Sequence, residues 1–373
     1  MNIVGAVLEE IGMARPYAES RPISICELDL DPPGHGELLV KIEAAGLCHS
    51  DLSVVNGNRV RPVPMLLGHE AAGRVVAVGA GIDDLRPGQR VVMAFLPRCG
   101  ECANCRTNGR LPCTPGSASN NAGELLAGGR RLHRDGGDVH HHLGVSGFAD
   151  HAVVDRRSVV PVDDDIPPQI AAVLGCAVLT GGGAVINAGD PQEDDIVVIV
   201  GLGGVGMAAL ITAVSLGRGP VIGIDAVADK LERARELGAS AVYTPQEAIG
   251  AGLKAPIVIE AAGNARAFET AVQVTGVGGK MITVGLPAPS ATATISPLGI
   301  TAEARTIVGS YLGSAVPTRD IPIFGQLWRE GRLPVEALIS STITLDDINQ
   351  AMDNLADGTA VRQVILFENG VNA

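Results

Sequence analysis

A glycine-rich turn between an apolar strand and an apolar helix constrains the fold of this chain most strongly. The turn is "GLGGVG", with Gly201, Gly203 and Gly206 in the spacing G-x-G-x-x-G, and the apolar run "IVVIV" comes directly before it. From about Thr180 onward, short β-branched stretches alternate with helix-like stretches. This alternation is typical of a parallel sheet, because neighbouring parallel strands need a crossover connection between them. The second half of the chain is therefore predicted to be an α/β domain.

The same glycine motif predicts a dinucleotide site. The first glycine permits the tight turn, the second lets backbone amides approach a pyrophosphate, and the third allows the helix to pack closely on the strand. Asp225 ends the next strand, "VIGID", 19 residues after Gly206, where a carboxylate accepts hydrogen bonds from adenosine ribose hydroxyls. That carboxylate would repel the additional phosphate of NADP, so the expected cofactor is NAD. A purely structural glycine-rich turn is the alternative.

Four of the seven cysteines lie close together, in the spacing C-x2-C-x2-C-x7-C: Cys99, Cys102, Cys105 and Cys113. Four thiolates complete a tetrahedral shell for zinc. Disulfides fit this segment poorly, because adjacent C-x2-C pairs strain a bridge and the chain lacks the cysteine framework of a secreted protein. Four unrelated buried thiols are the remaining alternative. A closed structural zinc site is predicted in a lobe at about residues 95–115, while Cys26, in "ISICELDL", is predicted to be a packing thiol.

Length and charge restrict the remaining possibilities. A chain of 373 residues is too long for one small core, so two domains are expected. The formal net charge of −13 disfavours nucleic acid as a partner. The N-terminal "MNIVGAVLEEIG" has no basic region, so it is not expected to be a signal peptide. Residues 196–217 are uncharged and long enough to span a membrane, but their glycine motif favours a strand–turn–helix. A cytoplasmic protein without a membrane partner is expected.

The distribution of β-rich, aperiodic and helix-like segments along the chain also predicts the domain organisation. Residues 1–95 alternate β-rich runs with glycine and proline, which predicts a mostly antiparallel β domain without helices of useful length. Residues 114–142 show no clear period and are predicted to be a long surface loop. Helices are predicted near 321–330 and 345–355, followed by a closing strand, "VRQVILF". The predicted division is a first domain at 1–177, a dinucleotide-binding domain at 178–315 and a return to the first domain at 316–373.

Three further residues form a second candidate metal set. Cys48 lies in "GLCHSD", His69 in "GHEAAG" and Cys176 in "GCAVLTG", and two cysteines with one histidine would leave the fourth position of a zinc ion open. Taken singly, each has a simpler explanation as a buried thiol or a core histidine. With the four-cysteine lobe, "GLGGVG" and "VRQVILF" in this order, the chain resembles the zinc-containing alcohol dehydrogenases of the medium-chain dehydrogenase/reductase superfamily over essentially its full length.

The resemblance implies an α/β protein with a GroES-like, mostly-β catalytic domain split around a Rossmann domain, a doubly wound parallel sheet. It implies two zinc ions per chain, one at Cys48, His69 and Cys176 and a structural one at the four-cysteine lobe, together with NAD. Asp51 matches a carboxylate that orients the zinc histidine, and Glu70 matches an acidic residue behind the metal that acts in its second shell or as an alternate ligand.

The resemblance also implies further site residues. The implied cofactor contacts are His49, Thr180, Gly201, Gly203, Gly204, Val205, Gly206, Asp225, Lys230 and Arg362. The implied substrate pocket consists of Arg59, Phe95, His142, Leu143 and Leu286. Arg59 and His142 stand where relatives often carry apolar side chains, so the alternative is that they point to solvent.

The implied reaction is the NAD-linked, reversible oxidation of primary or secondary alcohols to aldehydes or ketones. Ser50 matches the residue that takes the alcohol proton, and Ser53 stands where many relatives end the proton relay with a histidine, which leaves the proton exit open. Two alternatives remain: a thiol-adduct formaldehyde dehydrogenase of the S-hydroxymethyl-glutathione type, and a non-catalytic NAD-binding zinc scaffold. A homodimer is expected, with a tetramer as the alternative.

Overall fold

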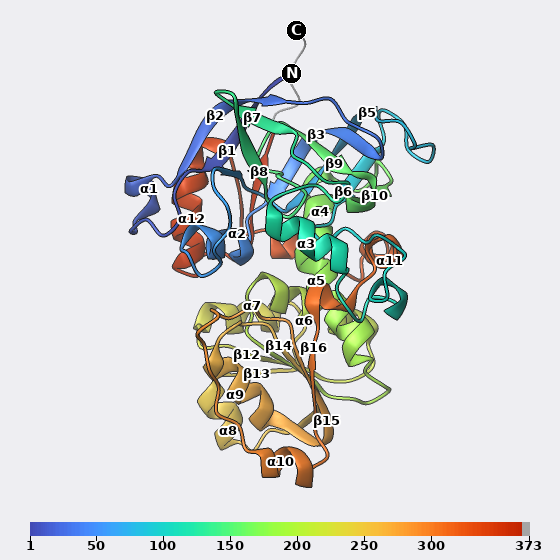
Figure 1. Cartoon of the computed structure of the whole chain (residues 1–373). Helices are drawn as coiled ribbons and strands as arrows, with labels where there is room; N and C mark the ends of the chain where they lie inside the picture. The colour runs from blue at the N-terminus through green and yellow to red at the C-terminus, as the bar shows by residue number, and fades with distance from the viewer. Residues whose placement is uncertain (368–373) are drawn as a thin grey trace. The chain divides into compact units, whose positions relative to one another are not determined.

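The computed structural model describes residues 1–367, and its contacts divide the chain into two compact units (Figure 1). The first unit comprises Met1–Thr107, Pro112–Cys176 and Ile339–Ala373, and the second comprises Asn108–Leu111 and Ala177–Leu338. The first boundary lies within one residue of the predicted division at 177. The predicted return at 316 comes too early, and the last six residues of the predicted 316–373 segment lie outside the described residues.

The late return has a packing cause. Helix α11 (Pro317–Arg329) buries Ile321, Phe324 and Leu327, and it packs against α5 (Leu179–Gly183) inside the second unit. Residues 316–338 therefore belong to the second unit, because the apolar face of α11 is buried there. The predicted terminal elements are confirmed as α11, a later helix α12 (Ile348–Ala356) and the strand β18 (Gln363–Leu366).

Two antiparallel-rich sheets build the first unit (Figure 1). A closed barrel has the order β1 (Asn2–Leu8), β2 (Ile23–Leu30), β7 (Leu132–Arg134), β8 (Gly137–His141) and β4 (Met65–Leu66). A seven-stranded sheet has the order β10 (Val159–Val162), β6 (Arg90–Met93), β5 (Glu70–Val78), β3 (Glu37–Gly46), β18 and β17 (Ser341–Ile343), and β9 (His151–Asp155) also pairs with β3. Apolar side chains from the barrel strands, such as Ile3, Val7 and Leu28, form its core, and Cys26 packs against them as predicted.

Two sequence-based expectations for this unit are wrong. Residues 114–142 are no simple surface loop, because they form α3 (Thr114–Ala122) and the hairpin of β7 and β8, which completes the barrel. The N-terminal region also holds a seven-residue helix, α2 (His49–Val55). The hairpin was missed because β8 buries Val139 and His141 on one side, and a histidine does not register as an apolar residue in a period-two pattern.

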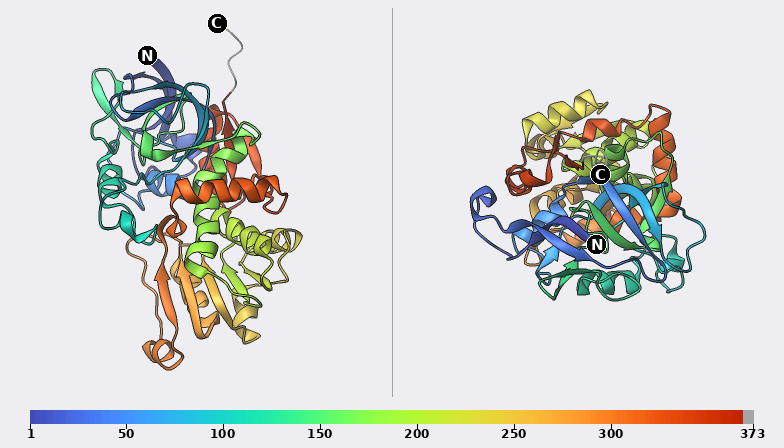
Figure 2. Two further views of the ribbon diagram at one scale, coloured as in Figure 1. Left: turned by 90° about the vertical axis from the view of Figure 1, so that its right-hand side faces the viewer. Right: turned by 90° about the horizontal axis from the view of Figure 1, so that it is seen from above.

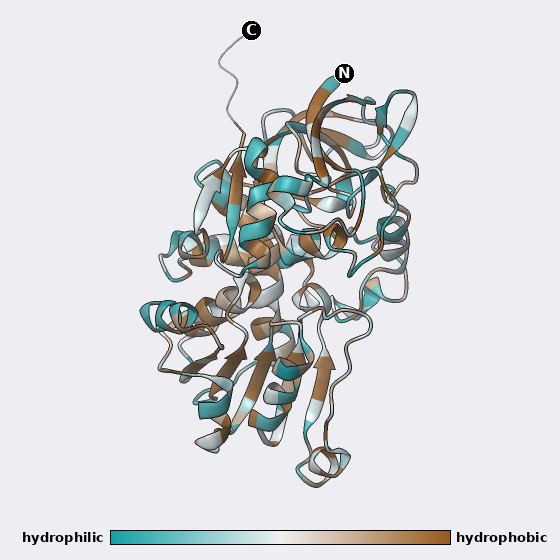
Figure 3. Cartoon of the chain, turned by 90° about the vertical axis from the view of Figure 1, so that its left-hand side faces the viewer, coloured by the Kyte–Doolittle hydropathy of each residue, from teal (hydrophilic) through white to brown (hydrophobic). Residues whose placement is uncertain are grey.

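Six parallel strands form the sheet of the second unit, in the order β13 (Ala241–Tyr243), β12 (Val221–Ile224), β11 (Val197–Val200), β14 (Ala255–Glu260), β15 (Thr275–Thr283) and β16 (Thr306–Gly309). Counted from β11, this is the order 3-2-1-4-5-6 of a Rossmann fold. The helices that pack against these strands are α6 (Gly204–Leu216), α7 (Ala228–Glu236), α8 (Pro245–Gly250) and α9 (Ala265–Val274) (Figure 2). The strands are mostly apolar (Figure 3), as parallel strands with covered faces require.

A long apolar helical run, Pro168–Gly189, is the one described helix with the length and composition of a membrane span. However, 89% of its apolar window is buried in the protein, which is the environment of a core helix. It consists of α4 (Pro168–Val173) and α5, each followed by a π-helical turn, Leu174–Val178 and Ala184–Gly189. The uncharged run at 196–217 forms β11, the glycine turn and α6, so the predicted strand–turn–helix is confirmed.

Candidate active site

Three segments that are remote in sequence bring Cys48, His69 and Cys176 together in the first unit. Their ligand atoms all lie within 4.8 Å of one another, and all three side chains are buried. Cys48 is the N-cap of α2, and His69 directly precedes β5. Cys176 lies in the π turn Leu174–Val178, a kind of helix irregularity that is frequent at functional sites. The two thiols and one imidazole are therefore arranged as a single donor set.

Asp51 holds two of these three residues. Its Oδ1 lies 2.9 Å from His69 Nδ1, and its Oδ2 accepts the backbone N–H of Cys48 at 3.0 Å. Burial acts to raise the pKa of Asp51, but the field of His69 and the neighbouring histidine contacts outweigh it and lower that pKa to about 2. The ionised carboxylate accepts the Nδ1 proton of His69, so Nε2 is the ring nitrogen that faces the thiols and that would bind a metal after losing its proton. Cys176 Sγ lies 3.4 Å from that Nε2 atom.

The charged groups around the donor set also fit a bound cation. Both carboxylate oxygens of Glu70 are buried without a hydrogen-bond partner, and Arg362 Nη1 approaches Oε2 at 3.4 Å. Burial raises the pKa of Glu70 to about 7, while the hydrogen bond from Cys176 and the field of Arg362 hold the pKa of Cys48 well below its usual value. Two thiols and one imidazole favour zinc, and three protein donors leave a position for substrate. The residues present therefore fit the zinc that the family pattern implies.

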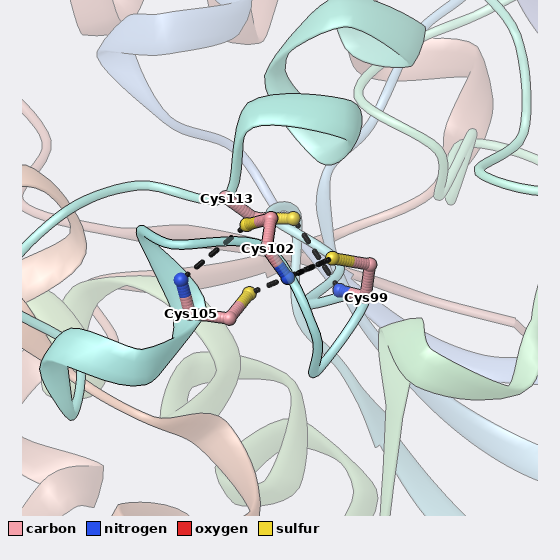
Figure 4. Close-up of side chains that lie close together, drawn as sticks. All are labelled: Cys99, Cys102, Cys105 and Cys113. Atoms are coloured by element: carbon pink, nitrogen blue, oxygen red, sulfur yellow. Dashed lines mark hydrogen bonds between the residues drawn. The ribbon is translucent and has the colours of Figure 1, made fainter.

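The four clustered cysteines also fit zinc (Figure 4). Their sulfurs lie within 4.8 Å of one another, and Cys99 and Cys105 are 3.9 Å apart. That distance is close to the ~3.8 Å expected between sulfurs at tetrahedral corners around a zinc ion with bonds of about 2.3 Å, and it is far longer than a disulfide. Backbone N–H groups of Thr114 and Cys105 lower the pKa of the Cys102 thiol to about 6, which favours the thiolate that zinc binds.

The glycine turn has the geometry of a dinucleotide cradle in the second unit. Gly201 has φ +92°, and a Cβ on Gly206 would lie 1.7 Å from the Gly201 carbonyl oxygen. A Cβ on Gly203 would meet nothing within 4 Å, so this glycine leaves open the side from which a pyrophosphate would approach. Asp225 directly follows β12 and accepts the N–H groups of Leu202 (2.7 Å) and Val227 (2.9 Å). The glycine turn and the carboxylate thus form one unit that fits a dinucleotide.

The other predicted cofactor residues lie on several elements. In the first unit, His49 is exposed at the start of α2, and Arg362 is 3% exposed with its guanidinium donating to Leu47 O at 2.6 Å. In the second unit, Thr180 is buried in α5, whereas Val205 in α6 and Lys230 in α7 are half-buried. Gly204 begins α6. The structure therefore places Arg362 against Glu70, and the cofactor contacts of these residues stay predictions.

The predicted pocket residues are also distributed over both units. Phe95 and His142 flank His69, with ring centroids 5.4 Å and 5.5 Å from it, and both rings meet the imidazole edge-on. Leu143 is buried beside His142, while Arg59 is half-buried. Leu286 belongs to the second unit and is 44% exposed.

For His142, the alternative of a solvent-directed side chain is wrong, because the residue is 1% exposed. Its Nδ1 atom lies 3.1 Å from Asp51 Oδ1, and Asp51, His69 and His142 thereby form a second close group. No sequence signal predicts this contact, since the three consecutive histidines in "HHHLG" cannot be distinguished without the fold.

Known proteins resemble the chain over both units. Residues 34–164 match the family model of the alcohol dehydrogenase GroES-like domain, and residues 204–327 match that of the zinc-binding dehydrogenases. The NDMA-dependent alcohol dehydrogenase of Amycolatopsis methanolica is 34% identical over 360 residues, which cover 94% of this chain and 97% of that protein.

Two solved structures extend the comparison. An alcohol dehydrogenase zinc-binding domain protein from Burkholderia ambifaria has a TM-score of 0.90 at 30% identity, and the benzyl alcohol dehydrogenase of Acinetobacter calcoaceticus has 0.89 at 29% identity. Each likeness covers 99% of this chain and 100% of the other. The fold and the matched relatives thus define an oxidoreductase with a GroES-like domain and a Rossmann domain. The chain belongs to the zinc-containing alcohol dehydrogenases of the medium-chain dehydrogenase/reductase superfamily.

Proposed function

We propose that this alcohol dehydrogenase is zinc-dependent and NAD-linked, and that it interconverts primary or secondary alcohols with aldehydes or ketones. The observation that carries the proposal is the buried donor set of Cys48, His69 and Cys176, held by Asp51. A scaffold protein needs no metal with an open coordination position, so this set favours catalysis over the non-catalytic alternative.

The side chains of this site have separable tasks. A zinc ion bound there supplies Lewis acidity, which lowers the pKa of a substrate hydroxyl. Asp51 fixes the His69 tautomer, and the buried surroundings exclude water from the donor set. We assign the first proton acceptance to Ser50, which is half-buried in the first turn of α2. Ser53 does not replace the relay histidine as a proton store, because a serine hydroxyl stays protonated at neutral pH; its Oγ donates to His49 O at 2.6 Å.

The cofactor preference follows from the second unit. NAD supplies the hydride acceptor. The open side at Gly203 and the Asp225 carboxylate support a dinucleotide whose adenosine ribose carries two free hydroxyls. We further propose a cytoplasmic homodimer, with a tetramer as the alternative, acting on small-molecule alcohols and not on nucleic acid or membranes.

Steady-state assays of NADH formation test this function. The purified protein is given NAD with benzyl alcohol, an aliphatic alcohol series and the formaldehyde–glutathione adduct in separate reactions, and Cys48→Ala serves as the site-disrupted control. We expect wild-type turnover on simple alcohols. We expect Cys48→Ala to lose at least a thousandfold in kcat/KM, because it removes one of the three metal ligands; each factor of ten corresponds to about 1.4 kcal/mol of barrier.

Other outcomes are equally decisive. Preference for the thiol adduct would establish the formaldehyde dehydrogenase alternative. NDMA is the compound in the name of the Amycolatopsis relative. If turnover required NDMA, then NDMA and not free NAD would be the terminal acceptor. A folded, zinc-loaded protein without turnover on any of these substrates would contradict the proposal.

A further inference from the structure

His142 shares a carboxylate oxygen with the predicted metal ligand His69. Its Nδ1 atom lies 3.1 Å from Asp51 Oδ1, an ion-pair distance without hydrogen-bond alignment, and His69 Nδ1 is hydrogen-bonded to the same oxygen at 2.9 Å. The His142 ring also meets the His69 ring edge-on. All three side chains are at most 1% exposed, so no solvent replaces these contacts. Asp51 is thus surrounded by two imidazoles and by the Cys48 backbone N–H.

The backbone fixes His142 in this place. Its N–H donates to Ser146 Oγ at 3.0 Å, and its carbonyl oxygen accepts the N–H groups of Val145 and Ser146. Leu143 and Ser146 have positive φ angles of 53° and 52°. Non-glycine residues adopt this conformation infrequently, so two of them within four residues make the course of this turn specific.

The segment that carries His142 is also aligned with the segment that carries His69. Gly147 N donates to Gly68 O at 3.0 Å, and Phe148 N donates to Leu67 O at 3.0 Å. A Cβ on Gly68 would lie 2.5 Å from Phe148 N, so a glycine is needed for this approach. Since Gly68 directly precedes His69, the backbone pairing sets the distance between the two imidazoles before any metal binds.

We propose that His142 is a positioning residue that fixes the Asp51 carboxylate and, through it, His69 and Cys48. Without His142, the carboxylate is held by His69 at Oδ1 and by the Cys48 N–H at Oδ2, and His142 adds a third contact that limits its remaining rotation about the Cβ–Cγ bond. The inference rests on the proposed function, because it assumes a zinc ion at Cys48, His69 and Cys176. Outer partners of metal ligands change metal affinity by about ten- to a hundredfold when they are removed.

Zinc release from the purified holoenzyme to a chromogenic chelator tests the proposal. His142→Phe keeps an aromatic ring beside His69 but removes the N–H group, and His142→Asn keeps an N–H donor near the Nδ1 position. We expect His142→Phe to release one of its two zinc ions about tenfold faster than wild type, and His142→Asn to remain within about threefold. The zinc of the four-cysteine lobe is an internal reference whose release should not change.

His140→Phe is the matched control, because it makes the same chemical change on β8 at a half-buried residue that contacts Arg130 instead of Asp51. His142→Leu replaces the Phe variant if that variant does not fold. Unchanged zinc release in His142→Phe, with an altered KM for alcohols alone, would overturn the proposal and make His142 a pocket wall. Wild-type protein that binds only the lobe zinc would instead refute the proposed function itself.

Discussion

At the scale of single residues, the two predicted sites depend on glycines that allow charged or polar groups to approach the backbone. Gly46, at the end of β3, faces the Glu70 side chain, and a Cβ there would lie 2.2 Å from Glu70 Oε1. Gly203 instead leaves open space. Glycine thus serves one site by making room for a protein carboxylate and the other by leaving room for a ligand.

Gly46→Ala should therefore displace Glu70 and destabilise the protein by about 1–3 kcal/mol, the usual cost of an overpacked core position. Thermal unfolding and zinc content measure the effect. Gly250→Ala is the control, because a Cβ at that position meets nothing within 4 Å and the residue lies at the end of α8. Equal stability of the two variants would show that Glu70 moves aside freely.

Asp225→Asn removes the charge directly after β12 but keeps an oxygen that can accept a backbone N–H group. We expect the preference for NAD over NADP to fall about tenfold, because repulsion of the ribose phosphate disappears. The ratio of kcat/KM for the two cofactors is the measurement. A wild-type enzyme that used both cofactors equally would place Asp225 away from the ribose.

At the scale of elements, the β7–β8 hairpin is joined to the residue after β2 by a histidine between two carboxylates. His133 Nε2 lies 2.9 Å from Asp31 Oδ2, and its Nδ1 lies 3.1 Å from Asp138 Oδ1. Arg130 also approaches Asp138, at 3.4 Å. The hydrogen bond to Asp31, followed by the contact with Asp138, raises the pKa of His133 above its usual value. The protonated imidazole therefore stabilises the attachment of the hairpin to the barrel.

The sign of the pH dependence follows from the raised pKa. The stabilisation is fully present below the unfolded-state pKa of about 6.5, and it is lost as the pH rises through the higher folded-state value. Because the imidazole is partly exposed, the effect should be small and reduced by salt. His133→Gln should remove this part of the pH dependence in urea unfolding curves. Identical pH profiles for the variant and wild type would exclude the role.

The strand β16 is an edge of the parallel sheet within residues 1–367, and we expect it to contribute to the proposed dimer interface. Ser310, the residue after β16, donates its N–H to Thr283 O of β15, so by alternation the N–H group of Ile307 points away from β15. An unpaired edge favours pairing with a second copy of the chain. Ile307→Pro should therefore weaken the proposed dimer without breaking bonds to β15, as measured by sedimentation. An unchanged sedimentation coefficient for a dimeric wild type would place the interface elsewhere.

At the scale of the whole molecule, two chemically distinct donor sets predict two zinc ions per chain with separable roles. Cys48→Ala should keep the fold and one zinc ion while losing activity, because the closed lobe is untouched. Cys102→Ala should mainly lose stability, since structural zinc sites contribute to folding directly. Metal analysis and thermal unfolding of both variants measure the difference. A fully active wild-type protein with a single zinc ion would contradict the assignment of the four-cysteine lobe.

The sequence by itself determined the features that depend on local spacing. Gly201, Gly203, Gly206 and Asp225 lie within one β–α–β unit, so their arrangement follows from the geometry of a strand, a turn and a helix. The four-cysteine lobe is similarly local. The resemblance built on these motifs and on Cys48, His69 and Cys176 gave the family and the two-domain fold.

Only the tertiary structure decided what depends on contacts between remote segments. It assigned the helix α11 to the second unit, because the apolar face of that helix is buried there. It turned residues 114–142 into a helix and two barrel strands, and it brought His142 to Asp51, 91 positions earlier in the chain. No periodicity encodes such a contact, because the pairing of two backbone segments around Gly68 and Gly147 sets the distance, and the spacing along the chain does not.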